Sequence, residues 1–267
     1  MDIEQKCQSW RIPAGLWKCM ASFLPKYRRS PKGGRPRNDL RQIADGIYYV
    51  LRTGCQWKAV PSEFGSGSTV HRYFQEWASL GVLRKSWARC LQRYDKRRGI
   101  QWAWQSVDCS TAKAPLGGKK TGPNPTDRGK LGVKRSVQSD GRGVPLGLTI
   151  DDANRHDQKL FRGTLKSIPL CRPRATSRRR QHLCCDKGYD GETIRREARR
   201  HHYTPHIKSR GEEQIAKRTK GRLARRWVVE RLNSWINRFR RILIRWEKKA
   251  ENYQAFIHLA FAYITWK

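Results

Sequence analysis

The chain has 267 residues, with 58 Lys and Arg against 22 Asp and Glu, which gives a formal net charge of +36. A hydrophobic fraction of 37% and eleven Trp are too high for a wholly disordered chain, so we expect a packed core inside a very basic surface. The longest apolar stretch, 255–266, is too short to span a membrane, and the first ten residues do not resemble a secretory signal. Eight Cys without a CxxC pair are typical of reduced thiols in a cytoplasmic protein, and a zinc site is not expected.

The net charge of +36 indicates a polyanionic partner. Each phosphate that Lys or Arg contacts releases condensed counterions, which favours binding and makes it sensitive to salt. Anionic lipid is the weaker alternative, because the sequence carries no lipidation motif. Nucleic acid is therefore the expected partner.

Three helices are predicted in the first hundred residues. Asn38 or Asp39 can cap a helix whose apolar side chains recur at helical spacing and which ends at Gly54. Ser68 or Thr69 can cap a second helix, and a third covers 83–91. Together they favour a helix-turn-helix-like unit over a plain three-helix cap. The second helix would then present these side chains to a DNA groove: His71, Arg72, Gln75 and Glu76.

A polar break at 95–99 predicts the boundary between an N-terminal helical DNA-binding domain, 1–98, and a second domain, 99–267. In the second domain the pattern predicts the following order: strand 101–109, basic loop 117–130, hairpin 131–150 around Asp140–Gly143, helix 158–168, strand 182–186, helix 191–200, strand 203–207, and helices 222–246 and 250–265. This order indicates an α/β fold with a mixed sheet flanked by helices, as in ribonuclease H-like proteins.

Three carboxylates stand out in this basic chain. Asp108 and Asp186 each end a predicted strand, and strand ends in α/β sheets open onto the crevice where ligands bind. Glu230 lies on a predicted helix with apolar residues on one face, and it shares a polar strip with Arg226, Asn233 and Asn237. Converging carboxylates suit Mg²⁺. Structural roles stay open at this point: a cap or turn for either Asp, and a surface ion pair of Glu230 with Arg226.

At these residues the sequence resembles the DDE transposases of bacterial insertion sequences, in the insertion-sequence-five group. The resemblance covers nearly the whole chain. The matching stretches are WRIPAGLWKCMASFLP and LRTGCQWKAVP in the N-terminal part, VDCSTAKAP around Asp108, TGPNPTDRGKLGVKRSV at 121–137, CCDKGYDGETIR around Asp186, and RRWVVERLNSWINRFRRILIRWE around Glu230.

The resemblance implies a ribonuclease H-like core in which Asp108, Asp186 and Glu230 are the catalytic, metal-binding residues. It implies two Mg²⁺ or Mn²⁺ ions per site, cleavage at the element ends, and transfer of the freed 3′-OH to target DNA. A related signature of Tyr, Arg, Glu and Lys is only partly kept, because Leu223 and Asn237 stand at the Tyr and Lys positions. The expected contacts to DNA are Arg72, Lys119, Lys120, Lys130, Arg226, Arg238 and Arg241.

Further expectations follow from the reaction that the resemblance implies. Two element ends must be cut, so a homodimer on DNA is expected. Its expected partner is double-stranded DNA, both the terminal inverted repeats of the element and the target. The expected location is the cytoplasm, in association with the nucleoid and with no membrane contact. Two other functions share the charge pattern: a regulatory DNA-binding protein derived from an inactive transposase, and an RNA-binding protein. The three carboxylates favour the transposase, and no module with base-stacking aromatic residues supports an RNA-binding protein.

Overall fold

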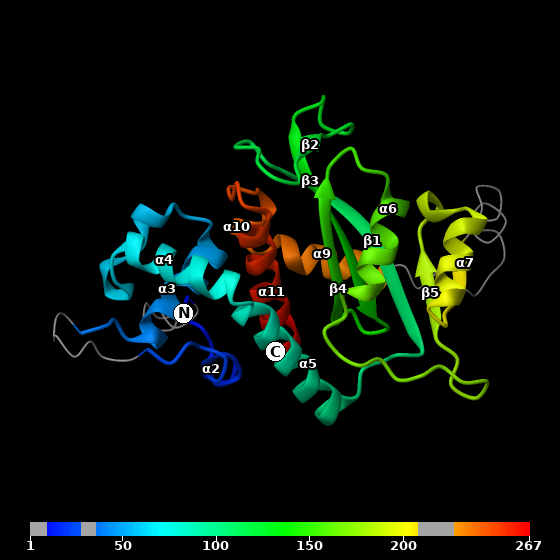
Figure 1. Ribbon diagram of the computed structural model, residues 1–267, viewed down its shortest axis with the longest axis horizontal. Helices are drawn as coiled ribbons and strands as arrows, with labels where there is room; N and C mark the ends of the chain where they lie inside the picture. Colours follow the sequence, from blue (N-terminus) through cyan, green and yellow to red (C-terminus); the bar gives the residue numbers. More distant parts are fainter. Residues whose placement is uncertain (1–9, 28–35, 208–226) are drawn as a thin grey trace.

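The computed structural model describes residues 10–27, 36–207 and 227–267, and one mixed sheet forms its centre (Figure 1). Strand β1 pairs antiparallel with β3 and parallel with β5, which in turn pairs parallel with β6. The other edge of β3 pairs with β4 and with the short β2. The strands are β1 (Trp104–Lys113), β2 (Gly122–Pro123), β3 (Leu131–Asp140), β4 (Pro145–Asp152), β5 (His182–Cys185) and β6 (Thr204–Ile207).

This strand order confirms the predicted fold class. Three antiparallel strands, β4, β3 and β1, are followed by β5 and β6, which both run parallel to β1 and are joined through a helix, as in ribonuclease H-like proteins. The predicted hairpin lies between β3 and β4. Its turn forms because Asp140 accepts hydrogen bonds from the backbone of Arg142 and Val144, at 2.8 Å each, and because Gly143 adopts a φ of 88°.

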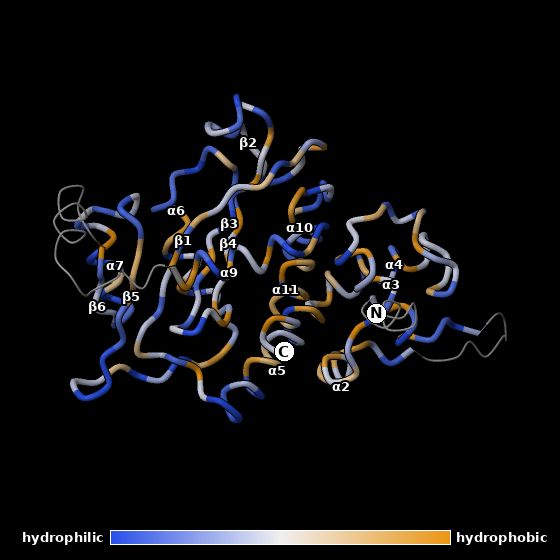
Figure 2. The backbone as a smooth tube through the Cα atoms, turned by 180° about the vertical axis from the view of Figure 1, so that it is seen from behind, coloured by the Kyte–Doolittle hydropathy of each residue, from blue (hydrophilic) through white to orange (hydrophobic). Residues whose placement is uncertain are grey.

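Helices cover both faces of the sheet. Helices α6 (Asp157–Lys166) and α7 (Glu192–Arg200) pack on one face, around a cluster that includes Val107, Phe161 and Leu183. Helices α9 (Trp227–Asn237) and α11 (Ala250–Trp266) pack on the other face, with the short α10 (Arg240–Leu243) between them. Figure 2 shows the hydrophobic residues concentrated along α11, in the middle of the molecule. The face covered by α9 is the one that carries Asp108.

The N-terminal helices begin and end where local sequence signals place them, with two corrections. Helix α3 (Leu40–Thr53) is capped by Asp39 and ends at Gly54, as predicted. Helix α4 (Gly67–Ser79) is capped by Ser66, not by Ser68 or Thr69. Helix α5 (Val82–Arg98) includes most of the predicted polar break and ends at Gly99, which has a φ of 69°. Helix α2 (Ala14–Ala21) and 3₁₀ turns at Trp57–Ala59, Ser62–Phe64 and Lys187–Tyr189 complete the described elements.

Helix α11 connects the N-terminal helices with the sheet. It packs against α5 and α4 on one side and against β4 on the other, so residues of both predicted domains share one hydrophobic core. Trp87 of α5 stacks on His258 of α11 and donates a hydrogen bond to the backbone oxygen of Pro145. The boundary at 98–99 coincides with the end of α5, and the division into two domains stays a prediction. None of the helices in the described ranges combines the length and hydropathy that a membrane crossing needs.

The predicted helix 222–246 is wrong in its extent. Helix α9 ends at Asn237, α10 is one turn long, and the chain from Ile244 to Lys249 is not helical. Ile244 instead forms a parallel β-bridge with Lys113, the last residue of β1 that pairs with β3. No Gly or Pro marks this break, and Phe239 and Ile242 next to it are buried. Residues 222–226 lie outside the described residues.

His258 makes the stability of the protein depend on pH. Burial, and then the charge of Arg84, lower the pKa of His258 from 6.5 to about 3. On acidification the imidazole is therefore protonated in the unfolded chain before it is protonated in the folded protein. The stability that the neutral imidazole contributes is fully present above pH 6.5 and is lost as the pH drops towards 3. Between pH 7 and pH 5 we expect wild type to lose about 2 kcal/mol more than His258→Phe. Urea denaturation at both pH values measures the difference, and equal losses in the two proteins would contradict this assignment.

Candidate active site

Asp108 and Asp186 lie side by side in the sheet. Strands β1 and β5 pair in parallel up to Val107 and Cys185, Asp108 is the next residue of β1, and Asp186 directly follows the end of β5. The prediction that Asp108 ends its strand is wrong, because β1 continues to Lys113 along β3 alone. The end of β5 nevertheless leaves both carboxylates at the carboxyl edge of the parallel pair, which is where α/β proteins bind ligands.

Helix α9 brings a polar strip to this edge. Its buried side chains Val229, Leu232 and Ile236 pack into the core and fix the helix on the sheet. Asn233 lies on the polar side and donates a hydrogen bond of 3.0 Å from Nδ2 to Oδ2 of Asp108. Glu230 is exposed and lies three residues earlier, so it shares a helix face with Asn233. The predicted polar strip is confirmed at Asn233.

The three carboxylates do not form a closed cage. In the part of the chain that the structure describes, no three His, Cys, Asp or Glu side chains are grouped closely enough to hold a metal ion. Asp186 caps the turn Lys187–Tyr189 and accepts a hydrogen bond of 2.5 Å from the backbone N–H of Lys187. The cap or turn role considered for Asp186 is therefore present, and it holds the carboxylate at the end of β5.

Two thiols next to the carboxylates remain protonated. Burial raises the pKa of Cys185 well above its usual value, and the charges of Cys184, Asp108 and Asp186 add to the effect. Burial likewise raises the pKa of Cys109 to about 12, and its sulfur lies 3.1 Å from the hydroxyl of Tyr189. Since the thiolate is the reactive form, neither cysteine is a nucleophile here.

Sequence reasoning missed two residues beneath α9. Ser110 donates a hydrogen bond of 3.2 Å to Oδ1 of Asn233, and Arg135 of β3 donates one of 3.1 Å to Oδ1 of Asn237. Arg135 is buried and lies between Val133 and Val137 on the inner face of the strand. A charged residue at an inward position of an alternating strand was the signal that could have identified it.

Most of the basic side chains predicted to contact DNA lie at the surface. Arg72, Lys119, Lys130 and Arg238 are exposed. Lys119 pairs with Glu251 at 3.5 Å, whereas Lys120 donates from Nζ to the backbone oxygen of Ile150, at 3.1 Å. Arg226 lies outside the described residues. His71 is half-buried and stacks on Trp57, and its place facing a DNA groove stays a prediction.

The prediction that Arg241 contacts DNA is wrong. Only 6% of Arg241 is exposed, and it pairs at 2.7 Å with Glu247, of which 7% is exposed. It also donates to the backbone oxygen of Cys55 and so ties α10 to the N-terminal helices. The buried Arg245 plays a similar role, because it donates to the backbone oxygens of Lys119 and Lys120 and fixes their loop. Both arginines are structural.

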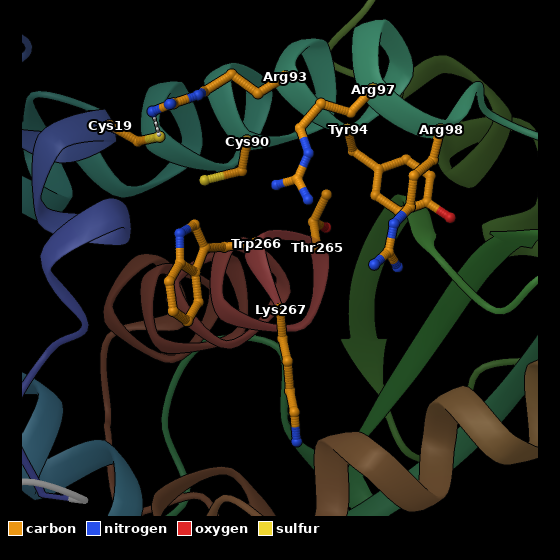
Figure 3. A pocket seen from close by; sticks show the side chains of 9 residues that line it. All are labelled: Cys19, Cys90, Arg93, Tyr94, Arg97, Arg98, Thr265, Trp266 and Lys267. Carbon is orange, nitrogen blue, oxygen red and sulfur yellow. Dashed lines mark hydrogen bonds between the residues drawn. The ribbon is translucent and has the colours of Figure 1, made fainter.

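A small cavity elsewhere is not a second candidate. It measures about 50 Å³ and lies between α2, α5 and the end of α11 (Figure 3). Arg93 extends across it and donates to the sulfur of Cys19 at 3.3 Å. This volume holds one or two water molecules, and its lining has no Asp or Glu side chain. The edge with Asp108 and Asp186 is therefore the candidate active site.

Comparisons with known families identify the family of the chain that carries this edge. Residues 12–87 match a family described as "Putative transposase of IS4/5 family", and residues 105–265 match the "Transposase DDE domain". The second match covers more than half of the chain and includes all three candidate carboxylates. This chain belongs to the DDE transposase family. DNA transposition is its function, and the regulatory alternative is not favoured.

Named relatives agree with this assignment. The transposase is 38% identical over 160 residues to the "Putative transposase for insertion sequence element IS402" of Burkholderia cepacia. The match covers 56% of this chain and 70% of the relative. It is 32% identical over 114 residues to an uncharacterised 16.2 kDa protein of the same element, over 41% of this chain and 78% of that protein.

Among solved structures, the pre-cleavage Mos1 transpososome overlaps the whole of this chain and 87% of that one, at 12% identity and a TM-score of 0.30. At that score the strand order, and not this overlap, carries the fold assignment.

Proposed function

We propose that this transposase cleaves DNA at the ends of an insertion sequence in a reaction that depends on divalent cations, and then joins the freed 3′-OH to target DNA. The proposed catalytic residues are Asp108, Asp186 and Glu230. The observation that carries the proposal is the parallel pairing of β1 and β5, which leaves Asp108 and Asp186 as neighbours at one sheet edge. The contact of Asn233 with Asp108 supports including Glu230, because Glu230 shares a face of α9 with Asn233.

The donor chemistry at this edge fits hard cations. Carboxylate oxygens are the ligands that Mg²⁺ and Mn²⁺ prefer, and Mg²⁺ keeps several waters, so a few carboxylates from an open edge suffice. Asp108, Asp186 and Glu230 would hold the ions. Bound there, two divalent cations would activate the attacking oxygen and stabilise the leaving 3′ oxygen. The family implies divalent ions in general, whereas two Mg²⁺ or Mn²⁺ ions per site is our proposal.

The remaining residues bind and place the DNA. A net charge of +36 favours phosphate contacts, and the exposed Arg72, Lys119, Lys130 and Arg238 are proposed to make them. Lys120 is proposed to contribute from the loop that Arg245 holds, and Arg226 from its position four residues before Glu230. Residues 1–98 are proposed as the DNA-binding domain and 99–267 as the catalytic domain.

The assembly follows from the substrate. An insertion sequence has two ends, and one active site at each end requires two copies of the chain. We therefore propose a homodimer on double-stranded DNA that holds both terminal inverted repeats and then the target. Association with the nucleoid is part of the same proposal.

A plasmid cleavage assay tests the proposed reaction. Wild type is incubated with a supercoiled plasmid that carries both element ends, in Mg²⁺, in Mn²⁺ and in EDTA. We expect nicked and linear products in either metal, with breaks mapped to the element ends, and none in EDTA. A plasmid without the ends is the matched control. Folded protein that binds the ends but cleaves in neither metal would overturn the proposed reaction.

A further inference from the structure

Asn233 connects α9 to two residues of β1. Its Nδ2 donates to Oδ2 of Asp108 at 3.0 Å, and its Oδ1 accepts from the hydroxyl of Ser110 at 3.2 Å. Asp108 and Ser110 are two residues apart in β1, so both side chains lie on the face that α9 covers. One amide therefore spans two successive inward positions of the strand.

The contact with Asp108 allows only one orientation of the amide. An ionised carboxylate accepts hydrogen bonds but donates none, so it requires the NH₂ group of Asn233. The reversed amide would direct its carbonyl oxygen at the carboxylate of Asp108, and the two oxygens would repel. Ser110 is compatible with this orientation, because its hydroxyl donates to the carbonyl oxygen on the other side.

We propose that Asn233 is a positioning residue of the active site. It sets the rotation of the Asp108 carboxylate and the position of Glu230 relative to that carboxylate. The inference rests on the proposed function, because it assigns Asp108 and Glu230 to a divalent cation. Glu230 lies one helical turn before Asn233, so the contact that orients Asp108 also joins the polar side of α9, which the buried side chains hold on the sheet, to the carboxylate. Groups that orient metal ligands typically contribute 10- to 100-fold to metal affinity or activity.

Direct metal binding tests the inference on the full-length protein. Mn²⁺ alone is titrated into wild type, Asn233→Ala, Ser110→Ala and Asp108→Ala, and the free ion is followed by electron paramagnetic resonance. We expect Asn233→Ala to raise the Mn²⁺ dissociation constant about 10- to 100-fold and Ser110→Ala to raise it less. The rate of plasmid nicking should fall at low Mn²⁺ and recover as Mn²⁺ is raised. Ser234→Ala, an exposed neighbour on α9, is the matched control and should behave as wild type.

The outcomes separate this inference from the proposed function. If Asp108→Ala loses Mn²⁺ binding but Asn233→Ala binds as wild type does, the positioning role is overturned and the proposed function stands. If Asp108→Ala also binds Mn²⁺ as wild type does, the proposed metal site fails and the inference fails with it. Thermal unfolding checks that each variant folds. Should Asn233→Ala fail to fold, Ser110→Ala decides: weaker binding supports the role, and wild-type binding overturns it.

Discussion

Replacing any one of Asp108, Asp186 and Glu230 with Ala is expected to lower the rate of nicking at the element ends by at least about 10²- to 10³-fold. That is the usual loss when a group that stabilises developing charge in the transition state is removed. Each carboxylate is proposed to hold a cation, and Ala supplies no oxygen in its place. The DNA affinity should stay close to that of wild type, because the basic surface is unchanged.

Rates of nicking on the plasmid with both ends and gel-shift affinities for one end measure the two effects separately. Asp190→Ala is the control, because Asp190 is an exposed acid close to the site that pairs with Arg195. Nicking by Glu230→Ala at the wild-type rate would remove Glu230 from the site and leave the two strand-end carboxylates. Loss of DNA binding in all three variants would instead indicate misfolding.

Breaking the buried pair of Arg241 and Glu247 is expected to cost about 3–5 kcal/mol of unfolding free energy. Burial raises the pKa of Glu247, and Arg241 opposes that rise at a distance of 2.7 Å. The variant Glu247→Ala leaves the guanidinium of Arg241 buried without its counter-charge, 5.7 Å from the ring centroid of Trp57 and 5.9 Å from that of Phe256. Urea denaturation near neutral pH measures the loss.

Two further variants check that burial causes this effect. Glu251→Ala breaks the ion pair with Lys119. The side chain of Lys119 is 72% exposed and that of Glu251 is 61% exposed, so the loss of unfolding free energy should be less than about 1 kcal/mol. The double variant Arg241→Met with Glu247→Leu removes both charges and should be more stable than Glu247→Ala. A Glu247→Ala protein as stable as the Glu251→Ala protein would contradict the structural role of Arg241.

Local signals predicted those parts of the fold that local interactions determine. The hairpin follows from Asp140 and Gly143, and α3 follows from Asp39 and Gly54, because each of these residues satisfies or permits the backbone geometry next to it. The neighbouring places of Asp108 and Asp186 needed a further step. Asp108 and Asp186 are predicted to be neighbours only if the order of strands and helices is interpreted as a fold in which β1 and β5 pair in parallel.

Tertiary packing determined what the sequence did not reveal. The end of α9 at Asn237 has no Gly or Pro to mark it, and the strand bridge from Ile244 to Lys113 follows directly after α10. Arg241 lies in a run of basic residues and looks like a surface cation, yet the distant Cys55 and the nearby Glu247 enclose it. The partners of Asn233 are more than a hundred residues away, so no local pattern predicts them.

A change of metal preference tests the central claim, that these carboxylates hold the cation, most directly. In Asp108→Cys a soft thiolate replaces a hard carboxylate ligand, and Mg²⁺ binds sulfur poorly whereas Mn²⁺ accepts it better. The control Asp190→Cys places a thiol at a nearby exposed acid that is not a proposed ligand. We predict that Asp108→Cys fails to nick the plasmid in Mg²⁺ and regains nicking in Mn²⁺, while the control nicks in both metals. Equal nicking by Asp108→Cys in Mg²⁺ and Mn²⁺, at the wild-type rate, would contradict a metal-binding role for Asp108.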